Sequence, residues 1–549
     1  MSTTTKTRSA SKTLRARSHE SRRGLILLFV GLMLSMLLAS LSQTVLSAAM
    51  PTMVGELNGV ENMLWIMTAY ILASTITMPI YGKLGDLIGR KSLLIAAILL
   101  FMAGSVIGGV AGDMNVLIIG RVVQGLGGGG LMILAQAIIA DVVPARERGK
   151  YMGVMGAVFA VSSVAGPLLG GWFTEGVGWR WTFWINIPLG ILALLAAVYF
   201  LHLPKRDPGK VGIDGWGMAL LAVATTALVL VASWGGKDFA WDSITIIGLM
   251  VVTVIAAVAF VLVERKTAEP IIPLSLFKDR NFNLTTIAGL LTGVGMFGAI
   301  GYLPTYLQMT FSADATQAGL LMIPMMGALL ITSVVTGALV SKYGRYKWMP
   351  IAGSLIVAIG MGLLGTLTPD TPLWLFCTYI AIMGMGLGTS MQILVLIVQN
   401  SFPNSQVGTA TASNNYFRQI GASLGSAVVG SLFATRLTDL LMDRLPAGSS
   451  AVGGINSLTP GAVKDLPDPL REVIDLAYND ALTPLFLYMV PLALAAFVLL
   501  LFVKEVPLAT TIERDVMAES IAEGQLLITS DDNDDRLPRG FVETSHKAG

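Results

Sequence analysis

Residues 82–91 read GKLGDLIGRK, and residues 337–345 read GALVSKYGR. The two stretches share Gly, Leu, Gly and Arg at the same offsets, 255 residues apart. A second set of glycines recurs at an offset of 259, with Gly149, Gly166 and Gly171 matching Gly408, Gly425 and Gly430. An internal repeat of this length predicts two halves of similar structure.

Long apolar runs surround both stretches. The chain is 54% hydrophobic and only 13% charged, whereas a soluble protein carries about 25% charged residues. Runs of at least about 18 apolar residues are long enough to span a membrane. The sequence therefore predicts an all-α polytopic membrane protein with fourteen transmembrane helices, near residues 24–49, 62–81, 92–112, 114–140, 150–174, 181–203, 214–235, 244–263, 282–308, 316–341, 349–367, 373–399, 411–435 and 482–503.

Basic residues orient these helices. Tails and loops on the side of the two termini hold 28 of the 36 Lys and Arg residues, six lie on the other side, and two lie within spans. Positive charge favours the cytoplasmic side of a membrane. We expect a protein of the cell (cytoplasmic) membrane with both termini in the cytoplasm.

The spans divide the chain into five parts. We expect a basic cytoplasmic tail over 1–23, an N-terminal six-helix bundle over 24–203, and two extra linker helices with a cytoplasmic loop over 204–281. A C-terminal six-helix bundle over 282–503 carries an extracellular loop, 436–481, in which residues 469–479 predict a short amphipathic helix. Residues 504–549 form a cytoplasmic tail that is partly disordered.

Several classes of function are excluded. Cys377 is the only cysteine and the three histidines are scattered, so we expect no metal site. A net charge of +2 gives no reason to expect a nucleic-acid partner. No phosphate-binding loop of the form GxxxxGK[ST] occurs, so we expect no nucleotide or other cofactor and no enzyme activity.

The loop at 82–91 carries a candidate conformational gate. Gly82 and Gly89 allow tight turns and close approach, and Asp86 can pair with Arg90 or bind a helix end. Such a cluster can hold one conformation and release it in another. Membrane topology alone would explain Arg90 and Lys91, but neither the glycines nor Asp86.

Two arginines lie inside spans. Arg121 is nine residues into its span, roughly 13 Å deep by helical rise, where a charge is costly and marks function. Arg418 is seven residues into its span, and a functional role and a structural anchor are both open. Gly166 and Pro167 form a weak point in the fifth span, although glycine-rich helix packing also explains the glycine.

These motifs resemble those of the major facilitator superfamily. Residues 82–91 resemble its loop motif, RVVQGLG at 121–127 its fourth-helix antiporter motif, and residues 153–171 its fifth-helix antiporter motif, with Ser162 where glycine is usual. Residues 179–190 resemble the entry to helix six in the fourteen-helix drug:proton antiporter branch. The likeness covers residues 24–506 and is weaker in the second half, where Ser341 replaces an acid.

The resemblance implies a secondary transporter with two six-helix bundles around a midplane cavity. Its activity would be export of amphipathic drugs by proton antiport and alternating access, giving antibiotic resistance. Arg121 and Gln124 would couple proton movement to transport. The expected partners are small amphipathic substrates, protons and membrane lipids, and the expected state is a monomer.

The first span departs from this family. Ser42 stands where the branch usually has an acidic residue, and a serine cannot carry a proton. None of the 34 carboxylates falls inside a predicted span, so a proton carrier would be a rim carboxylate, Asp141 first and Glu56 second. Each is also explained as an ordinary helix-end or loop acid. A cavity without carboxylates should suit neutral, amphipathic or anionic substrates better than dications.

Position alone suggests which residues contact substrate, although each could equally be core or lipid-facing. Aromatic, flexible and polar groups suit a cavity that accepts varied apolar molecules. The candidates are Ser42, Gln43, Trp65, Tyr70, Gln136, Phe297, Tyr302, Tyr306, Met325, Asn415 and Arg418. Other open functions are export of an endogenous lipid or metabolite, solute import, and a receptor or scaffold that does not transport.

Overall fold

The structure of the chain is a computed structural model. It describes residues 3–510 except 58, 60–61, 202, 204–211, 213, 237, 312, 314, 445–462 and 464–466, and for residues 3–23, 299, 315–316 and 468 it describes the backbone only. The expectations for the side chains of the N-terminal tail, for residues 511–549 and for most of the segment 445–466 lie outside the described residues.

Helices make up the regular structure of the described residues, which contain no β-strand. The first half contains α1 (Thr3–Glu56), α2 (Met63–Ile88), α3 (Arg90–Gly109), α4 (Met114–Val142), α5 (Ala145–Glu175), α6 (Trp181–Trp184) and α7 (Asn186–Phe200). Next come α8 (Gly215–Trp234), α9 (Ile244–Glu264) and the short 3-10 helix η2 (Leu274–Lys278). The second half contains α10 (Arg280–Ile300), α11 (Leu303–Thr310), α12 (Ala315–Leu321), α13 (Ile323–Tyr343), α14 (Trp348–Leu364), α15 (Leu373–Ser401), α16 (Val407–Arg444) and α18 (Asp468–Leu501).

The described helices account for fourteen spans. Thirteen are long and apolar enough to cross a membrane, and α14, with 17 residues, is the fourteenth. Two predicted spans are each built from two helices, α10 with α11 and α12 with α13. Pro304 and Pro324 occupy the second positions of α11 and α13, where a proline begins a helix because it has no N–H to donate. The predicted span near 181–203 is likewise divided, into α6 and α7.

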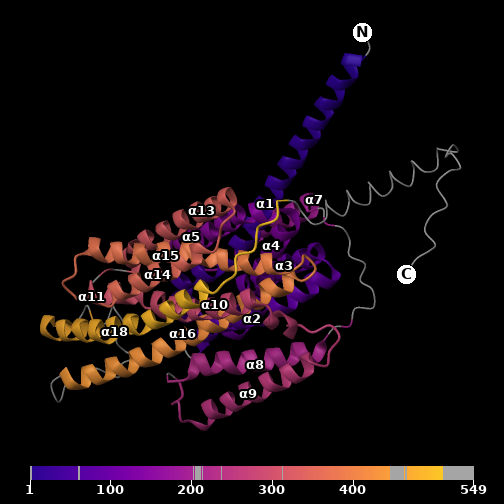
Figure 1. The fold of residues 1–549 in the computed structure, drawn as a ribbon. Coiled ribbons are helices and arrows are strands. Elements are labelled where there is room, and N and C mark those ends of the chain that lie inside the picture. The colour runs from indigo at the N-terminus through magenta and orange to yellow at the C-terminus, as the bar shows by residue number, and fades with distance from the viewer. Residues whose placement is uncertain are drawn as a thin grey trace, which may run out of the picture.

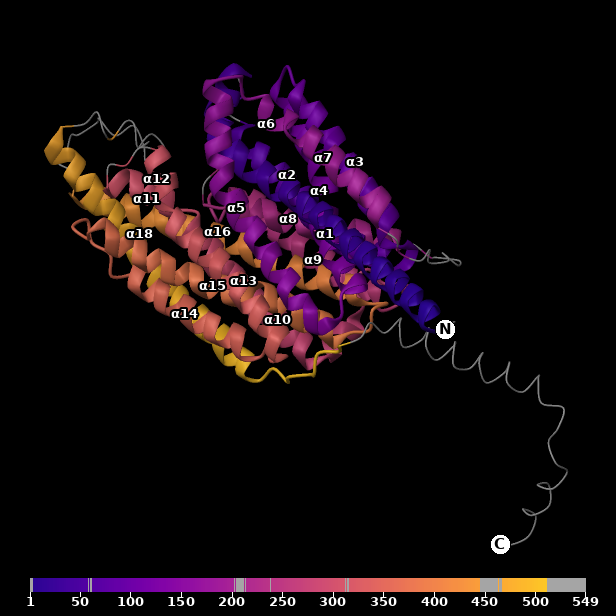
Figure 2. The same ribbon diagram turned by 90° about the horizontal axis from the view of Figure 1, so that it is seen from above.

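Two bundles lie side by side, as Figures 1 and 2 show. Helices α1 to α7 form one, and α10 to α18 form the other. Helices α8 and α9 pack on each other, and α8 also contacts α2 and α16. The predicted fold class, two six-helix bundles with two extra helices, is confirmed.

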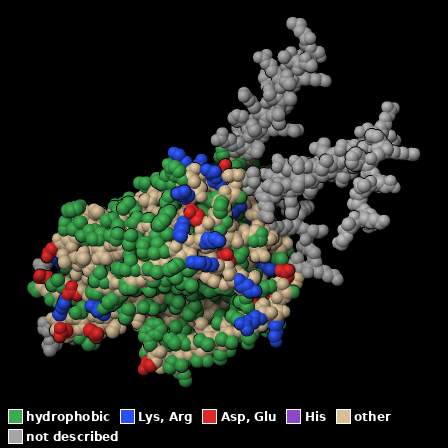
Figure 3. Space-filling view, in the orientation of Figure 1, with side chains coloured by type: hydrophobic (Ala, Val, Ile, Leu, Met, Phe, Trp, Pro, Cys, Tyr) green, Lys and Arg blue, Asp and Glu red, His purple; other side chains and the backbone are tan. Residues whose placement is uncertain are grey.

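The outer surface is apolar, and basic side chains gather toward one end. Many large apolar side chains of α9 are exposed, among them Ile244, Val254 and Ile255, each more than 60% accessible. Such a surface suits lipid rather than water. Figure 3 shows Lys and Arg side chains concentrated toward the end where α1 leaves the body.

Glycines from the two repeats meet where the halves cross. A Cβ at Gly82 of α2 would meet Ala412 and the carbonyl oxygen of Gly408, both on α16. A Cβ at Gly337 of α13 would meet the carbonyl oxygen of Gly149 on α5. In each half, the first glycine of the loop motif (Gly82 or Gly337) contacts the glycine of the second repeat (Gly408 or Gly149) in the opposite half. The internal repeat therefore relates the two contacts to each other.

Residues 504–509 cross the same end as an extended strap. Asn281 binds the backbone of Lys504 in both directions, at 2.8 and 2.9 Å. Glu505 accepts a hydrogen bond from the Tyr346 backbone N–H at 2.9 Å, just before α14 begins. The backbone N–H of Arg146 donates to Ala509 at 3.0 Å, so the strap also reaches the first half.

The segment 436–481 is more helical than expected. Helix α16 continues to Arg444, and α18 begins at Asp468. The expected short amphipathic helix is the first part of α18, continuous with the last span. Its apolar face is buried, with Ile474 and Ala477 at 0% exposure, because that face packs against the second bundle rather than a membrane surface.

Candidate functional site

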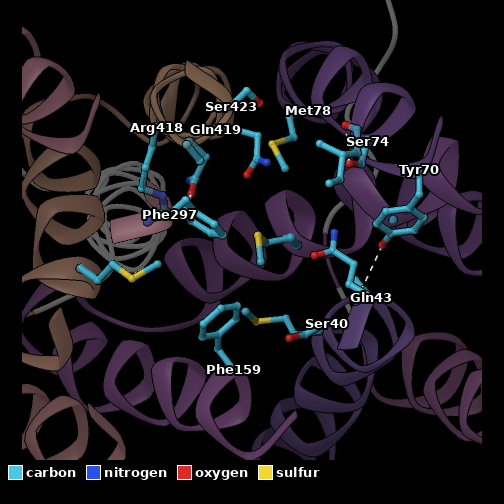
Figure 4. Close-up of a pocket in the computed structure, with 18 of the residues that line it drawn as sticks. Ser40, Gln43, Tyr70, Ser74, Met78, Phe159, Phe297, Arg418, Gln419 and Ser423 are labelled. Atoms are coloured by element: carbon cyan, nitrogen blue, oxygen red, sulfur yellow. Dashed lines mark hydrogen bonds between the residues drawn. The ribbon is translucent and has the colours of Figure 1, made fainter. Parts of the chain in front are cut away.

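A cavity of about 340 Å³ lies between the two bundles. Helices α1, α2, α4 and α5 line it on one side and α10, α13, α15 and α16 on the other, and α8 also contributes. Its wall mixes thioether, aromatic and polar side chains, including Met78, Met132, Phe159, Phe297, Ser40, Gln43, Gln136, Gln392 and Gln419. Figure 4 shows several of these side chains around the hollow, with α16 residues on one side and Gln43 and Tyr70 on the other.

The cavity reaches the end of the molecule opposite the glycine crossings. Leu64, near the start of α2, and Ser233, near the end of α8, line it. Gly82 and Asp86 lie near the other end of α2. The bundles therefore pack closely at the Asp86 end while the cavity extends toward the opposite end.

Six of the eleven expected substrate residues line this cavity: Gln43, Tyr70, Gln136, Phe297, Asn415 and Arg418. Five do not. Ser42 is 1% exposed behind the wall, because adjacent residues of a helix point about 100° apart. Trp65 packs edge-on against Trp234.

The other three belong to the second bundle's own packing. Tyr302 packs against Phe433. Tyr306 is fully buried and donates to Asn479 at 2.8 Å. Met325 is fully buried in the same apolar core. The expectation that these three line the cavity is not met in this structure, since their helix faces are turned into the bundle.

Arg121 is fully buried but does not line the cavity. Its guanidinium donates to the Ile66 carbonyl at 2.9 Å, to Ser42 Oγ at 3.1 Å and to Gln124 Oε1. The ring of Tyr70, which does line the cavity, lies 4.3 Å from the guanidinium carbon. Neutral acceptors and a ring face thus hold this cation, and Ser42 supplies one of them at the position where the resemblance led us to expect an acid.

A hydrogen-bond chain extends behind Arg121. Gln124 donates to Ser105 Oγ at 2.8 Å, and Asn186 Nδ2 donates to the same oxygen at 3.3 Å. These bonds join α4 to α3 and α7. They position the amide oxygen of Gln124 toward the arginine.

Arg418 lies in the cavity wall. Its Nη2 donates to Asn415 Oδ1, and Asn415 Nδ2 donates to Gln136 Oε1 at 3.0 Å. This chain links α16 of the second half to α4 of the first. Among the described residues that line the cavity, Arg418 is the only one with a formal charge.

Asp86 joins the two halves at the closed end. Its Oδ1 accepts from Arg90 at 2.6 Å and from the Gly408 backbone N–H at 3.2 Å. Its Oδ2 accepts from the backbone N–H and the hydroxyl of Thr409, at 2.7 and 2.8 Å. Because α16 begins at Val407, the carboxylate sits at the positive N-terminus of a helix from the other half.

Arg90 completes this junction. It is 2% exposed, pairs with Asp141 at 2.6 Å, and donates to the Ala137 carbonyl at 2.6 Å and the Asn404 carbonyl at 3.2 Å. Two carboxylates from α2 and α4 thus hold one buried guanidinium. We call Asp86, Arg90, Asp141 and Thr409 the closing cluster.

The crossing of α13 with α5, which the internal repeat relates to the crossing of α2 with α16, has weaker polar contacts. Ser341, the counterpart of Asp86, accepts from the Lys150 backbone N–H at 3.0 Å near the start of α5. Arg146 Nη2 donates to the Lys342 carbonyl at 3.2 Å. A neutral hydroxyl replaces the carboxylate here, so Ser341 makes no charge-assisted bond of the kind that Asp86 makes at the first crossing.

The remaining gate residues lie around these crossings. Gly89 has φ of 99° between α2 and α3, a conformation that glycine adopts without strain. Lys91 donates to the Val198 carbonyl of α7 at 2.9 Å. Gly166 and Pro167 lie in α5 against α1, where a Cβ on the glycine would meet the Thr44 hydroxyl.

Both candidate proton carriers are ion-paired and outside the cavity wall. Asp141, near the end of α4, pairs with Arg90. Glu56, at the opposite end of the molecule, accepts from Arg180 and from the Trp179 indole, each at 2.6 Å. Helices extend past the apolar runs, so Glu56 and Asp86 belong to helix ends rather than loops, and Asp141 lies at a helix end as expected.

Sequence reasoning missed Thr409 and Gln392. Thr409 precedes the predicted thirteenth span. Its role as a donor to Asp86 depends on its place at the start of α16, which the sequence does not show. Gln392 is a polar residue inside an apolar run and lines the cavity. Its isolation in the twelfth span was a signal that could have identified it.

Comparison with known proteins identifies the family. A model described as the Major Facilitator Superfamily matches residues 32–426. The chain belongs to the major facilitator superfamily. An uncharacterized MFS-type transporter of Mycobacterium tuberculosis is 40% identical over 503 residues, covering 92% of this chain and 72% of that protein.

Other relatives carry functional names. The multidrug transporter protein MdtP of Bacillus subtilis is 38% identical over 473 residues, covering 84% of this major facilitator chain and 87% of that one. The solved proton:xylose symporter XylE aligns with a TM-score of 0.55 at 18% identity, covering 90% of this chain and 99% of that one. The likeness to XylE, at this low identity, shows the fold alone.

Proposed function

We propose that this major facilitator protein exports amphipathic small molecules across the cytoplasmic membrane by proton antiport. The observation that carries the proposal is the cavity between the bundles, whose thioether, aromatic and amide groups suit varied apolar molecules with some polar groups. The relatives named as multidrug transporters support the same substrate class.

Alternating access follows from how the bundles are joined. The closing cluster and the two glycine crossings hold one end together, while the cavity extends to the other. Rocking the bundles would break the first set of contacts and close the opposite end. In this proposal the termini are cytoplasmic, the structure is an outward-open state, and the transporting unit is a monomer because one chain encloses the cavity.

Asp141 is the proposed proton carrier, with Glu56 second. In the closed cluster Asp141 is paired with Arg90, which favours its ionised form. Opening of that end would break the contacts of Asp86 and Arg90 with the second half and admit water to the cluster, where Asp141 could then exchange a proton. Conformational change and protonation are thereby linked at one residue.

The test is dye efflux from cells that lack their main pumps and express this chain. We expect expression to lower accumulation of amphipathic dyes and to raise drug resistance, and we expect a protonophore to abolish both effects. Unchanged dye accumulation and drug susceptibility would refute export. Efflux that survives the protonophore would refute proton coupling.

A proton-release assay on purified protein separates the two carriers. Substrate addition should release protons from the wild type and not from Asp141→Asn, while Glu56→Gln serves as the comparison at the opposite end. Unchanged release in both variants would remove both residues from the mechanism.

A further inference from the structure

The cavity wall has an uncompensated positive charge. Arg418 is the only residue with a formal charge among the described residues that line the cavity, and no Asp or Glu is among them. Within the described part of the chain, its guanidinium donates one side-chain hydrogen bond, to the neutral amide oxygen of Asn415. A partly buried cation without a counter-ion is costly, and a bound anion would lower that cost.

Arg121 does not share this role. It lies behind Tyr70 and outside the cavity wall, with Ser42, Gln124 and the Ile66 carbonyl as acceptors. Its charge therefore faces protein acceptors, whereas the guanidinium of Arg418 borders open volume. The two intramembrane arginines differ in what they can bind.

Neighbouring groups fix the direction of Arg418 and leave donors free for a ligand. Gln136 of α4 accepts from Asn415, and Asn415 in turn accepts from Arg418. An oriented guanidinium with several N–H groups matches the geometry of a carboxylate, sulfonate or similar oxyanion. Gln419 and Ser423, one and five residues further along α16, also line the cavity and add polar groups beside it.

The rest of the wall suits an apolar body. Phe297 of α10, Phe159 of α5 and Met78 of α2 line the same volume. A molecule with one anionic group and an aromatic or aliphatic body would therefore place its charge at α16 and its apolar part between the bundles.

We propose that Arg418 binds the anionic group of the substrate, so that the transporter selects amphipathic monoanions over cations of the same size and shape. This inference rests on the proposed function, because it names the substrate class of the same cavity. It assigns Arg418 a specificity role that the other lining residues lack.

The experiment compares fluorescent probes that share one aromatic body and differ only in charge: anionic, neutral and cationic. Wild-type protein in proteoliposomes should transport the anionic probe fastest. Arg418→Gln should lower transport of the anionic probe by about tenfold or more, the size expected for a charge-assisted bond, with little effect on the neutral probe. Arg418→Lys should retain part of the preference, and Arg418→Glu should reverse it toward the cation.

A matched control removes an arginine outside the cavity. Arg444, the last residue of α16, forms an exposed ion pair with Asp480 of α18. Arg444→Gln loses this pair and should keep the wild-type charge preference. Monodispersity and thermal unfolding of each variant show whether it folds. Wild-type preference for the cationic probe, or unchanged transport of the anionic probe by folded Arg418→Gln, would overturn the inference.

Failure of the proposed function gives a different result. If the wild type transports none of the probes, equilibrium binding of the same three probes to purified protein decides the inference. Binding that favours the anion and is lost in Arg418→Gln supports the site even then. Binding that is equal for all three charges overturns it.

Discussion

At the scale of residues, the closing cluster joins the halves through the carboxylate of Asp86 and the guanidinium of Arg90. Asp86 accepts four hydrogen bonds, three of them from α16 of the opposite half. At the equivalent place Ser341 accepts one backbone bond from α5. Both crossings contain a pair of glycines in close contact. Their polar contacts differ in strength, because the carboxylate of Asp86 is replaced by the hydroxyl of Ser341.

Replacing Asp86 by Asn should therefore weaken the closed end far more than replacing Ser341 by Ala. The first change leaves a buried guanidinium with one carboxylate in place of two, at a cost on the order of 3 kcal/mol. The second removes two bonds of a neutral hydroxyl, one from the Lys150 N–H and a longer one to the Glu147 carbonyl, each of about 1 kcal/mol or less. Thermal unfolding of both variants measures this difference, and equal shifts in Tm would contradict it.

The two intramembrane arginines show what sequence could and could not predict at this scale. A charge within an apolar run is visible in the sequence, so both residues were candidates. Their environments were not, because the side of a helix that meets a cavity depends on its packing partners. Ser42 and Gln43 are adjacent in sequence, yet one binds Arg121 and the other lines the cavity.

At the scale of helices, glycine decides how closely the halves approach. Gly337 and Gly149 place two backbones in contact, and neither backbone has a flexible group that could move aside. Helix crossings of this kind depend on small residues. A side chain at either position must separate α13 from α5.

Gly337→Val should therefore open the end that the closing cluster holds. In a Cys377→Ala background, a cysteine introduced at Gln136 should become accessible to a membrane-impermeant thiol reagent from the cytoplasmic side. Gly327→Val is the matched control on the same helix, since a Cβ at Gly327 meets no atom within 4 Å. The same labelling rate in both variants would show that the crossing does not control access.

Apolar run length predicted the number of spans but not their interruptions. Crossing a membrane requires about 20 apolar residues, which is a property of composition and can be counted. The breaks before α11 and α13 depend on where a proline is accommodated in a packed bundle. The apolar face of residues 469–479 predicts a separate amphipathic helix at the outer surface, but in the structure this face packs inward as the first part of α18.

At the scale of the whole molecule, an even number of spans predicts that both termini lie on one side of the membrane. The excess of Lys and Arg assigns that side to the cytoplasm. A phosphatase reporter inserted after Asp242, between α8 and α9, should be active in the periplasmic or external space. The same reporter after Thr267 should be inactive, and activity at Thr267 would reverse the orientation.

A cavity in which the described lining residues carry one charge, that of Arg418, has an energetic consequence for the cell. Energised membranes are negative inside, and each elementary charge that crosses 100 mV exchanges about 2.3 kcal/mol with the field. A monoanion that left the cytoplasm through this cavity would move with that field, whereas a cation would move against it. The membrane voltage would then drive export of the substrates that Arg418 selects, even before any proton returned.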